Sequence, residues 1–290
     1  MKKEKTSFAI HIVFILFSLI CIIPFMIVVS ASFTSIQDIS FHGFSILPPK
    51  IDISAYEYLF ESPKIIIDGY KITILITTVG TFLSVMIMSM AAYALARPNC
   101  VFKGFLNAYI FFPTLLSGGL TSSYIINTQY LHLTDSVWSM ILPGMVNVFH
   151  VFMIRTFFKQ LPESLFDAAK VDGASELRIF FTIALKLSKP VIATISFLGA
   201  LTRWNEWYQA MLYIRTPEKY PLQYLLQRMM RNIQELLDST MDVAAMAPEK
   251  IPGENLRMAL LVVCIGPIML IFPFFQKYFT KGMTVGAVKG

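Results

Sequence analysis

The chain has 290 residues, of which 56% are hydrophobic and 14% are charged, and its formal net charge is +6. A soluble domain usually has about 25% charged residues, so this composition argues against one. A basic excess can indicate nucleic-acid binding. Here the positions of the charges indicate membrane topology instead, and we expect no nucleic-acid partner.

The apolar residues gather in six blocks, each long enough to cross a bilayer as a helix of about 20 residues. The first block, from Thr6 to Gln37, is too long for a signal-peptide core, so we expect it to be a retained helix. Helices are favoured because lipid offers no partners to backbone polar groups. We therefore predict an all-α integral membrane protein with a single transmembrane domain over residues 1–290 and spans at about 8–30, 72–96, 104–126, 136–158, 190–214 and 257–276.

The charges between the blocks favour one orientation. With the N-terminus in the cytoplasm, the inner segments hold 14 basic and 5 acidic residues, whereas the outer loops hold 9 basic and 12 acidic residues. The positive-inside rule favours this arrangement. Both termini are then expected in the cytoplasm, and residues 38–70 and 216–254 are expected to form two long external loops.

Within the second external loop, apolar residues recur at helical spacing from Leu222 to Leu237, and polar residues fill the other faces. This pattern predicts an amphipathic helix. Such a helix either lies on the membrane and caps its own bundle, or forms a docking surface for an external partner. The pattern is compatible with both.

The cytoplasmic segment of about residues 160–188 is predicted to form two helices joined by a sharp turn. Pro162 followed by Glu163 is typical of a helix start. Gly173 after Asp172 is typical of a helix stop, and a second short helix is expected to begin near Ser175. Small residues at the corner would let the surface of another protein approach closely.

This segment resembles the cytoplasmic loop of ABC-importer permeases, whose motif is E-A-A, three residues, G, nine residues, I-x-L-P. Here the motif reads Asp167 to Ala169, then Gly173, then Ile183 to Lys186, with the same spacing throughout. Asp167 stands where glutamate is usual and keeps the charge. Lys186 stands where proline is usual, so we expect the second helix to continue slightly further.

The rest of the chain resembles the carbohydrate-importer permeases of the MalG type, and within them the LplC/YtcP branch of Gram-positive bacteria. The resemblance rests on Arg203 to Trp207, Tyr220 to Gln223, and the ending from Pro273 to Gly290. It implies the type I importer architecture and a multi-pass location in the bacterial cell membrane. It also implies an oligosaccharide or related carbohydrate as substrate, moved by alternating access.

The resemblance further implies four kinds of partner: a second, different permease, two cytoplasmic ATPase subunits, an external lipid-anchored solute-binding protein, and the sugar. ATP and Mg²⁺ would be bound by the ATPases, and this chain would hold no cofactor. The residues expected to couple to the ATPases are Asp167, Ala168, Ala169, Asp172, Gly173 and Ala174. The tail residues expected to contact the ATPases are Thr284, Gly286, Lys289 and Gly290.

The fifth span carries polar residues, which are costly in lipid and normally face a bundle interior, a partner or a water-filled path. Because aromatic rings and polar groups together suit sugars, we expect six residues to be candidates for a substrate path. They are Arg203, Trp204, Asn205, Glu206, Trp207 and Gln209. A structural reading stays open, in which Arg203 and Glu206 neutralise each other and the tryptophans belong to an interfacial belt.

No catalytic or metal site is expected. The chain has no phosphate-binding Gly-x4-Gly-Lys-Ser/Thr loop, and its four histidines are scattered. An ion-coupled secondary transporter would need acids buried in several spans, and only Glu206 qualifies. A membrane-embedded enzyme would need clustered histidines or acids at one membrane face. An ABC importer of a non-sugar solute remains the alternative function.

Overall fold

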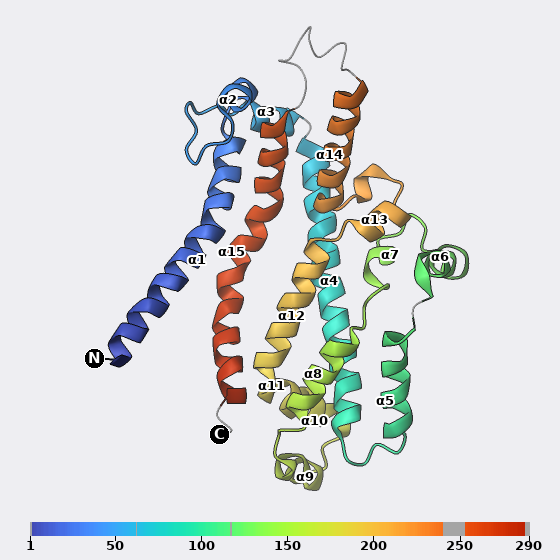
Figure 1. Cartoon of the computed structure of the whole chain (residues 1–290). Coiled ribbons are helices and arrows are strands. Elements are labelled where there is room, and N and C mark those ends of the chain that lie inside the picture. The colour runs from blue at the N-terminus through green and yellow to red at the C-terminus, as the bar shows by residue number, and fades with distance from the viewer. Residues whose placement is uncertain (1, 62, 117, 240–252, 288–290) are drawn as a thin grey trace. The chain divides into compact units, whose positions relative to one another are not determined.

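The computed structural model describes residues 2–61, 63–116, 118–239 and 253–287. Throughout these ranges the chain forms helices, turns and loops and no strand, which confirms the all-helical prediction. It divides into two compact units, Met1–Ile67 with Leu225–Pro267, and Asp68–Tyr224 with Ile268–Gly290. We call these units 1 and 2 and describe each by itself (Figure 1).

Unit 1 is built around the first helix and the start of the loop that was predicted to be external. Its elements are α1 (Lys2–Ser32), α2 (Ile36–His42), α3 (Ser54–Glu61) and parts of α4, α14 and α15. The ring centroid of Phe33 lies 4.9 Å from that of Tyr56, and the hydroxyls of Ser32 and Tyr56 are 2.9 Å apart. These contacts fasten α3 to the end of α1.

Unit 2 carries the rest of the chain. Its elements are α4 (Pro63–Ala96), α5 (Lys103–Phe111), η1 (Phe112–Thr114), α6 (Gly119–Ile125), η2 (Ile126–Tyr130), α7 (Trp138–Ile141), α8 (Val148–Phe158), α9 (Glu163–Val171), α10 (Glu176–Ile179), η3 (Phe180–Ala184), α11 (Leu185–Leu187), α12 (Lys189–Trp204), α13 (Tyr208–Tyr213) and η4 (Pro217–Lys219), with α14 (Leu222–Ser239) and α15 (Glu254–Ala287) shared between the units. α14 occupies the segment in which the amphipathic helix was predicted.

Three helices in the described residues are long and apolar enough to cross a membrane: Ile10–Ser32, Pro63–Ala96 and Glu254–Ile271. The number rises to five if each of two bent helix pairs is counted as one span. One of these pairs, Glu176–Leu187 with Lys189–Trp204, bends by 84°. The predicted number of six spans and the orientation of the termini therefore stay predictions.

Three predicted spans are not continuous helices. In the third predicted span, η1 contains Pro113 and ends at Thr114, and α6 begins only at Gly119, whose φ is +77°. The fourth span is interrupted after α7 by Pro143 and Gly144, and Asn147 then caps α8. The fifth ends as α12 at Trp204 and restarts as α13 at Tyr208.

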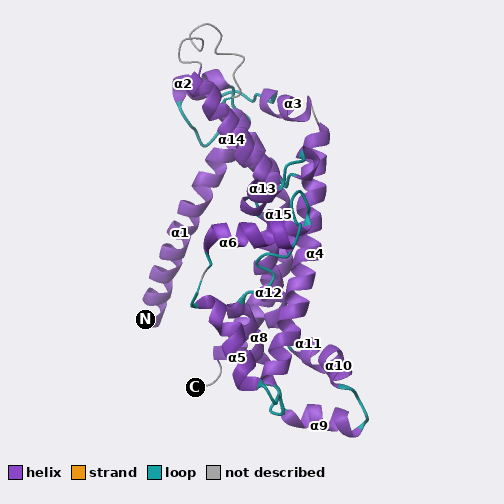
Figure 2. Ribbon diagram, turned by 90° about the vertical axis from the view of Figure 1, so that its right-hand side faces the viewer, coloured by secondary structure: helices purple, strands orange, loops and turns teal. Residues whose placement is uncertain are grey.

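The largest apolar cluster of unit 2 lies where α4, α8, α10 and α12 meet. Val151, Ile154, Ile179 and Ile195 are fully buried there, together with Phe180 at 1% exposure. Figures 1 and 2 both place α9 at the end of this unit, beyond the end of α4. The predicted cytoplasmic segment therefore projects from a firmly packed base.

Candidate functional site

The segment from Glu163 to Leu187, which we call the 163–187 hairpin, forms the predicted helix, turn and helix. α9 ends at Val171, and Gly173 follows in the left-handed conformation with a φ of +77°. The amide of Gly173 donates to the carbonyl of Lys170, and the amide of Ala174 donates to the carbonyl of Ala169, both at 2.9 Å. These two bonds are those of a Schellman motif, which satisfies the last carbonyls of the helix.

The second arm starts at the predicted place. The side chain of Ser175 accepts a hydrogen bond from the amide of Arg178 at 3.3 Å, so Ser175 caps α10. The arm continues through the π-helical turn η3 into α11, which ends at Leu187. Lys186, in the place of the usual proline, lies inside this continuation.

The turn presents its predicted coupling residues on the outside. Four of the six are exposed, and the other two are half-buried against the apolar cluster of unit 2. The exposed ones are Asp167, Ala168, Asp172 and Gly173, and the half-buried ones are Ala169 and Ala174. Apolar side chains are exposed beside them, Val171 at 88% and Leu177 at 60%. The hairpin thus offers small and apolar surface at its tip.

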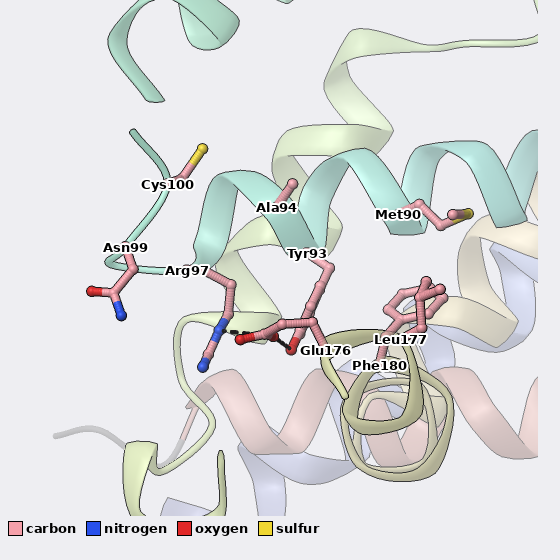
Figure 3. A pocket seen from close by; sticks show the side chains of 9 residues that line it. All are labelled: Met90, Tyr93, Ala94, Arg97, Asn99, Cys100, Glu176, Leu177 and Phe180. Atoms are coloured by element: carbon pink, nitrogen blue, oxygen red, sulfur yellow. Dashed lines mark hydrogen bonds and ion pairs between the residues drawn. The ribbon is translucent and has the colours of Figure 1, made fainter. Parts of the chain in front are cut away.

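The inner face of the hairpin packs on the end of α4. Phe166 is 3% exposed, and the guanidinium carbon of Arg97 lies 4.4 Å from the centre of its ring. Tyr93 donates a hydrogen bond of 2.6 Å to the carboxylate of Glu176. A cavity of ≈ 360 Å³ lies beside this contact, and Figure 3 shows its lining.

Sequence analysis did not single out Tyr93, Arg97 and Glu176. Tyr93 and Arg97 are one helical turn apart at the exit of the second predicted span, which is a visible signal. Their partner Glu176 lies 83 residues from Tyr93 along the chain, and no local pattern connects the two.

The six polar and aromatic residues of the fifth span fall into two groups. Arg203 and Trp204 are 8% and 3% exposed, so neither is on a surface of this chain. The guanidinium of Arg203 donates to the hydroxyl of Ser84 at 2.5 Å and to the carbonyls of Met140 and Ile141 at 3.3 Å. Arg203 therefore links α12 to α4 and α7. The burial of Trp204 does not fit an interfacial belt, and a substrate-path role for either residue stays a prediction.

The remaining four residues lie at the break between α12 and α13. Glu206 accepts a hydrogen bond of 2.8 Å from the amide of Gln209 and so caps α13. Asn205 is exposed and accepts a bond of 3.2 Å from Gln223, and Trp207 is 37% exposed. Asn205 and Trp207 are therefore the two exposed members of the set, whereas Glu206 and Gln209 are partly buried.

At the other end of unit 2, Asp135 joins two loops. Its carboxylate accepts hydrogen bonds from the amides of Arg215 and Thr216, the hydroxyl of Thr216 and the ammonium of Lys219. The bond from Lys219 is the largest of the effects that hold the pKa of the Asp135 carboxyl well below its usual range. This cluster fixes the exit from α13.

The predicted tail site is only partly covered by the structure. Thr284 and Gly286 belong to the last turns of α15, and the surroundings of both residues are outside the described part of the chain. Lys289 and Gly290 lie outside the described residues altogether.

Comparison with known proteins gives relatives that match over nearly the whole chain. The polygalacturonan/rhamnogalacturonan transport system permease protein YtcP of Bacillus subtilis (strain 168) is 35% identical over 290 residues, which is 100% of both chains. Protein LplC of the same strain is 36% identical over 272 residues, covering 93% of this chain and 90% of LplC.

A solved structure is similar in fold as well. It is titled the crystal structure of a bacterial ABC transporter involved in the import of the acidic polysaccharide alginate. The TM-score is 0.82 at 26% identity, with 96% of this chain and 98% of that chain covered.

The family description "binding-protein-dependent transport system inner membrane component" matches residues 2–285. Its members are transport components and not enzymes, as predicted. The predicted resemblance to sugar-importing ABC permeases is confirmed by these relatives. The chain belongs to the family of inner membrane components of binding-protein-dependent transport systems.

Proposed function

We propose that this chain is one of two different permease subunits that together carry an oligosaccharide through the bacterial cell membrane. Its family and its sugar-transporting relatives support a carbohydrate importer. An external solute-binding protein would deliver the sugar, and two ATPase subunits would bind ATP and Mg²⁺. The Bacillus relatives support a Gram-positive cell membrane as the location.

The observation that carries the proposal is the outer surface of the 163–187 hairpin. Val171 is 88% exposed next to a turn whose backbone is fixed by the Schellman bonds. A large exposed apolar side chain on a rigid projection favours burial against another protein. The small residues Ala168 and Gly173 beside it would let that protein approach the backbone closely.

For alternating access, we propose that the hairpin transmits the movement of the ATPases to unit 2. When ATP closes the ATPases, they would pull the hairpin by its outer surface. On the inner side, Phe166 and Phe180 are 3% and 1% exposed and pack against the apolar cluster. The pull would therefore reach α4 and α8 and open the path outward, and hydrolysis would reset it inward.

For the substrate we propose an acidic oligosaccharide. YtcP is named for the transport of polygalacturonan and rhamnogalacturonan, and the solved structure for the import of the acidic polysaccharide alginate. Asn205 and Trp207 offer a polar group and an aromatic ring to such a sugar at the helix break. A neutral sugar or a non-sugar solute is the alternative that a substrate screen distinguishes.

The experiment is reconstitution of this chain, the second permease and the ATPase in liposomes, with the solute-binding protein added. Uptake of labelled oligogalacturonate and of neutral oligosaccharides is measured together with ATP hydrolysis. We expect uptake that needs ATP and the binding protein. Uptake driven by an ion gradient without ATP would overturn the proposal.

A pair of matched variants tests the docking surface. Val171→Glu should abolish the stimulation of ATP hydrolysis, because it places a charge on the surface that docks the ATPase. Val101 is also 88% exposed but lies outside the hairpin, between α4 and α5, so Val101→Glu should leave stimulation within about twofold of wild type. Equal effects of the two changes would contradict the assignment.

A further inference from the structure

One carboxylate ties both arms of the 163–187 hairpin to α4. Glu176, in the first turn of α10, accepts the hydrogen bond of 2.6 Å from the hydroxyl of Tyr93 in α4. Its other oxygen lies 2.9 Å from the ammonium of Lys170 in the last turn of α9. Arg97, the residue that follows the end of α4, lies 3.7 Å from the same carboxylate (Figure 3). We call Tyr93, Arg97, Lys170 and Glu176 the Tyr93 clamp.

The ring of Tyr93 is also the centre of an aromatic cluster. It lies 6.0 Å from Phe158 of α8, 6.4 Å from Phe166 of α9 and 5.4 Å from Phe180 of η3, measured between ring centroids. These contacts hold four elements together, but aromatic pairs are favourable over a range of about 4.5–7 Å between ring centroids. A charge-assisted hydrogen bond has a defined length and angle, so it fixes an orientation that the rings alone do not.

Space beside the clamp makes this orientation important. The cavity of ≈ 360 Å³ is lined by residues of both partners, among them Met90 and Ala94 of α4 and Leu177 of α10. Side-chain packing therefore does not restrict movement of the hairpin on the side of the cavity. A hairpin held by apolar contacts alone would be free to tilt toward the cavity when pulled.

We propose that the Tyr93 clamp is the positioning device that fixes the angle between the 163–187 hairpin and α4, so that a pull on α9 becomes movement of α4. The inference rests on the proposed function, and it assigns the link to residues outside the docking surface. The four residues position the hairpin and touch neither sugar nor nucleotide.

The charge state of Glu176, which precedes the predicted fifth span, supports this role. Burial alone would raise the pKa of its carboxyl. The hydrogen bonds from Lys170 and Tyr93 and the charge of Arg97 outweigh burial and hold the pKa below its usual range. Glu176 is therefore ionised at neutral pH, and the three contacts exist under the conditions of transport.

Two variants remove the clamp without removing the packing. Tyr93→Phe keeps the ring and deletes only the hydroxyl, and Glu176→Gln keeps the shape and deletes the charge. In the assembled complex we expect each to raise the ATP hydrolysed per sugar imported by about threefold or more. The unfolding temperature should stay within about 3 °C of wild type. Tyr109→Phe, the same change at a tyrosine that is 68% exposed, is the control.

The double variant shows whether the two groups act through one bond. Tyr93→Phe combined with Glu176→Gln should be no worse than the poorer single variant. Losses that multiply in the double variant would overturn the inference. So would uptake and hydrolysis that fall in equal proportion, because they indicate a general structural role.

A measurement independent of transport separates this inference from the proposed function. Spin labels at Ile87→Cys in α4 and Leu165→Cys in α9, in a chain whose three native cysteines are replaced, report the distance between α4 and the hairpin. Tyr93→Phe should broaden the distance distribution, and Tyr109→Phe should leave it unchanged. An unchanged distribution in Tyr93→Phe refutes the clamp, whereas a wild-type complex that imports no sugar refutes only the proposed function.

Discussion

Replacing Gly80 by alanine should displace the buried arginine of α12. A Cβ atom at Gly80 would lie 2.7 Å from Cδ and Nε of Arg203 and 2.9 Å from Cζ. These separations are well inside the optimal contact distance of about 3.5–4.0 Å. Arg203 has little freedom to yield, because it is 8% exposed and bonded to Ser84, Met140 and Ile141.

The size of the effect follows from those bonds. A hydrogen bond to a charged group contributes about 1.5–3 kcal/mol, and a displaced arginine would lose at least one. Alanine gains about 1 kcal/mol over glycine in a helix interior, which offsets part of the loss. We therefore expect Gly80→Ala to destabilise the chain by about 0.5–2 kcal/mol.

Gly199→Ala is the matched control. Gly199 lies in α12 and its added Cβ would meet Thr81 of α4 at 3.7 Å, which is ordinary contact. This change should be neutral or stabilising by up to about 1 kcal/mol. Thermal unfolding in one detergent, with membrane insertion checked separately, compares the two variants.

A second-site variant tests the cause. In an Arg203→Ala background the obstacle is gone, so Gly80→Ala should no longer destabilise, and the two changes should be non-additive by about 1 kcal/mol or more. The reasoning is refuted if Gly80→Ala and Gly199→Ala behave alike, or if the cost of Gly80→Ala is the same with and without Arg203.

Three further predictions concern the hairpin, the Asp135 cluster and the helix break. Because Gly173 has a φ of +77°, the Gly173→Asn variant should be more stable than the Gly173→Ala variant by about 0.5–1 kcal/mol, and equal thermal stabilities of these two would contradict the backbone argument. Gly173→Arg should uncouple ATP hydrolysis from transport. The pKa of the Asp135 carboxyl is lowered in the folded chain, mainly by the hydrogen bond from Lys219. Asp135 therefore stabilises the fold fully at a pH above its pKa in the unfolded chain, and this stabilisation is lost as the pH falls through its pKa in the folded chain. The Asp135→Asn variant should therefore be less stable than wild type at pH 7 and should lose less stability than wild type below about pH 4. Stabilities of variant and wild type that fall in parallel from pH 7 to 3 would disprove this. Asn205→Ala and Trp207→Ala should each lower sugar uptake by a larger factor than they lower copurification with the partner permease. Equal losses of uptake and copurification would favour a structural role for these residues.

The 163–187 hairpin was predictable because its signals are local. Pro162 before α9, Gly173 after it and Ser175 before α10 each act on backbone groups within a few residues. Such signals do not depend on the rest of the fold, so the order and approximate ends of both helices follow from the sequence.

The interrupted spans were not predicted, although their signals are present. A long apolar run suggests one helix, and the runs over 104–126 and 136–154 contain no charged residue that would end it. Pro113 and Pro143 mark two of the breaks, and Glu206 caps the helix after the third. The prediction of spans used the length of the apolar run, and single residues such as these do not change that length, so the breaks were not recognised.

The contacts of the candidate site could not be predicted at all. Tyr93 and Glu176 are 83 residues apart, and Arg203 and Ser84 are 119 apart. Which of many possible partners meet depends on the packing of α4 against α10 and α12. The sequence therefore indicated that Arg203 needs a polar environment but gave no means of finding its acceptors.

The buried arginine also has a consequence for biosynthesis. An arginine at the centre of a membrane helix costs about 2.5–3.5 kcal/mol during insertion unless a partner compensates its charge. All three acceptors of Arg203 precede it in the chain, Ser84 by 119 residues, Met140 by 63 and Ile141 by 62. A ribosome therefore delivers α4 and α7 before α12 emerges. The order of synthesis makes the acceptors available when the arginine enters the bilayer.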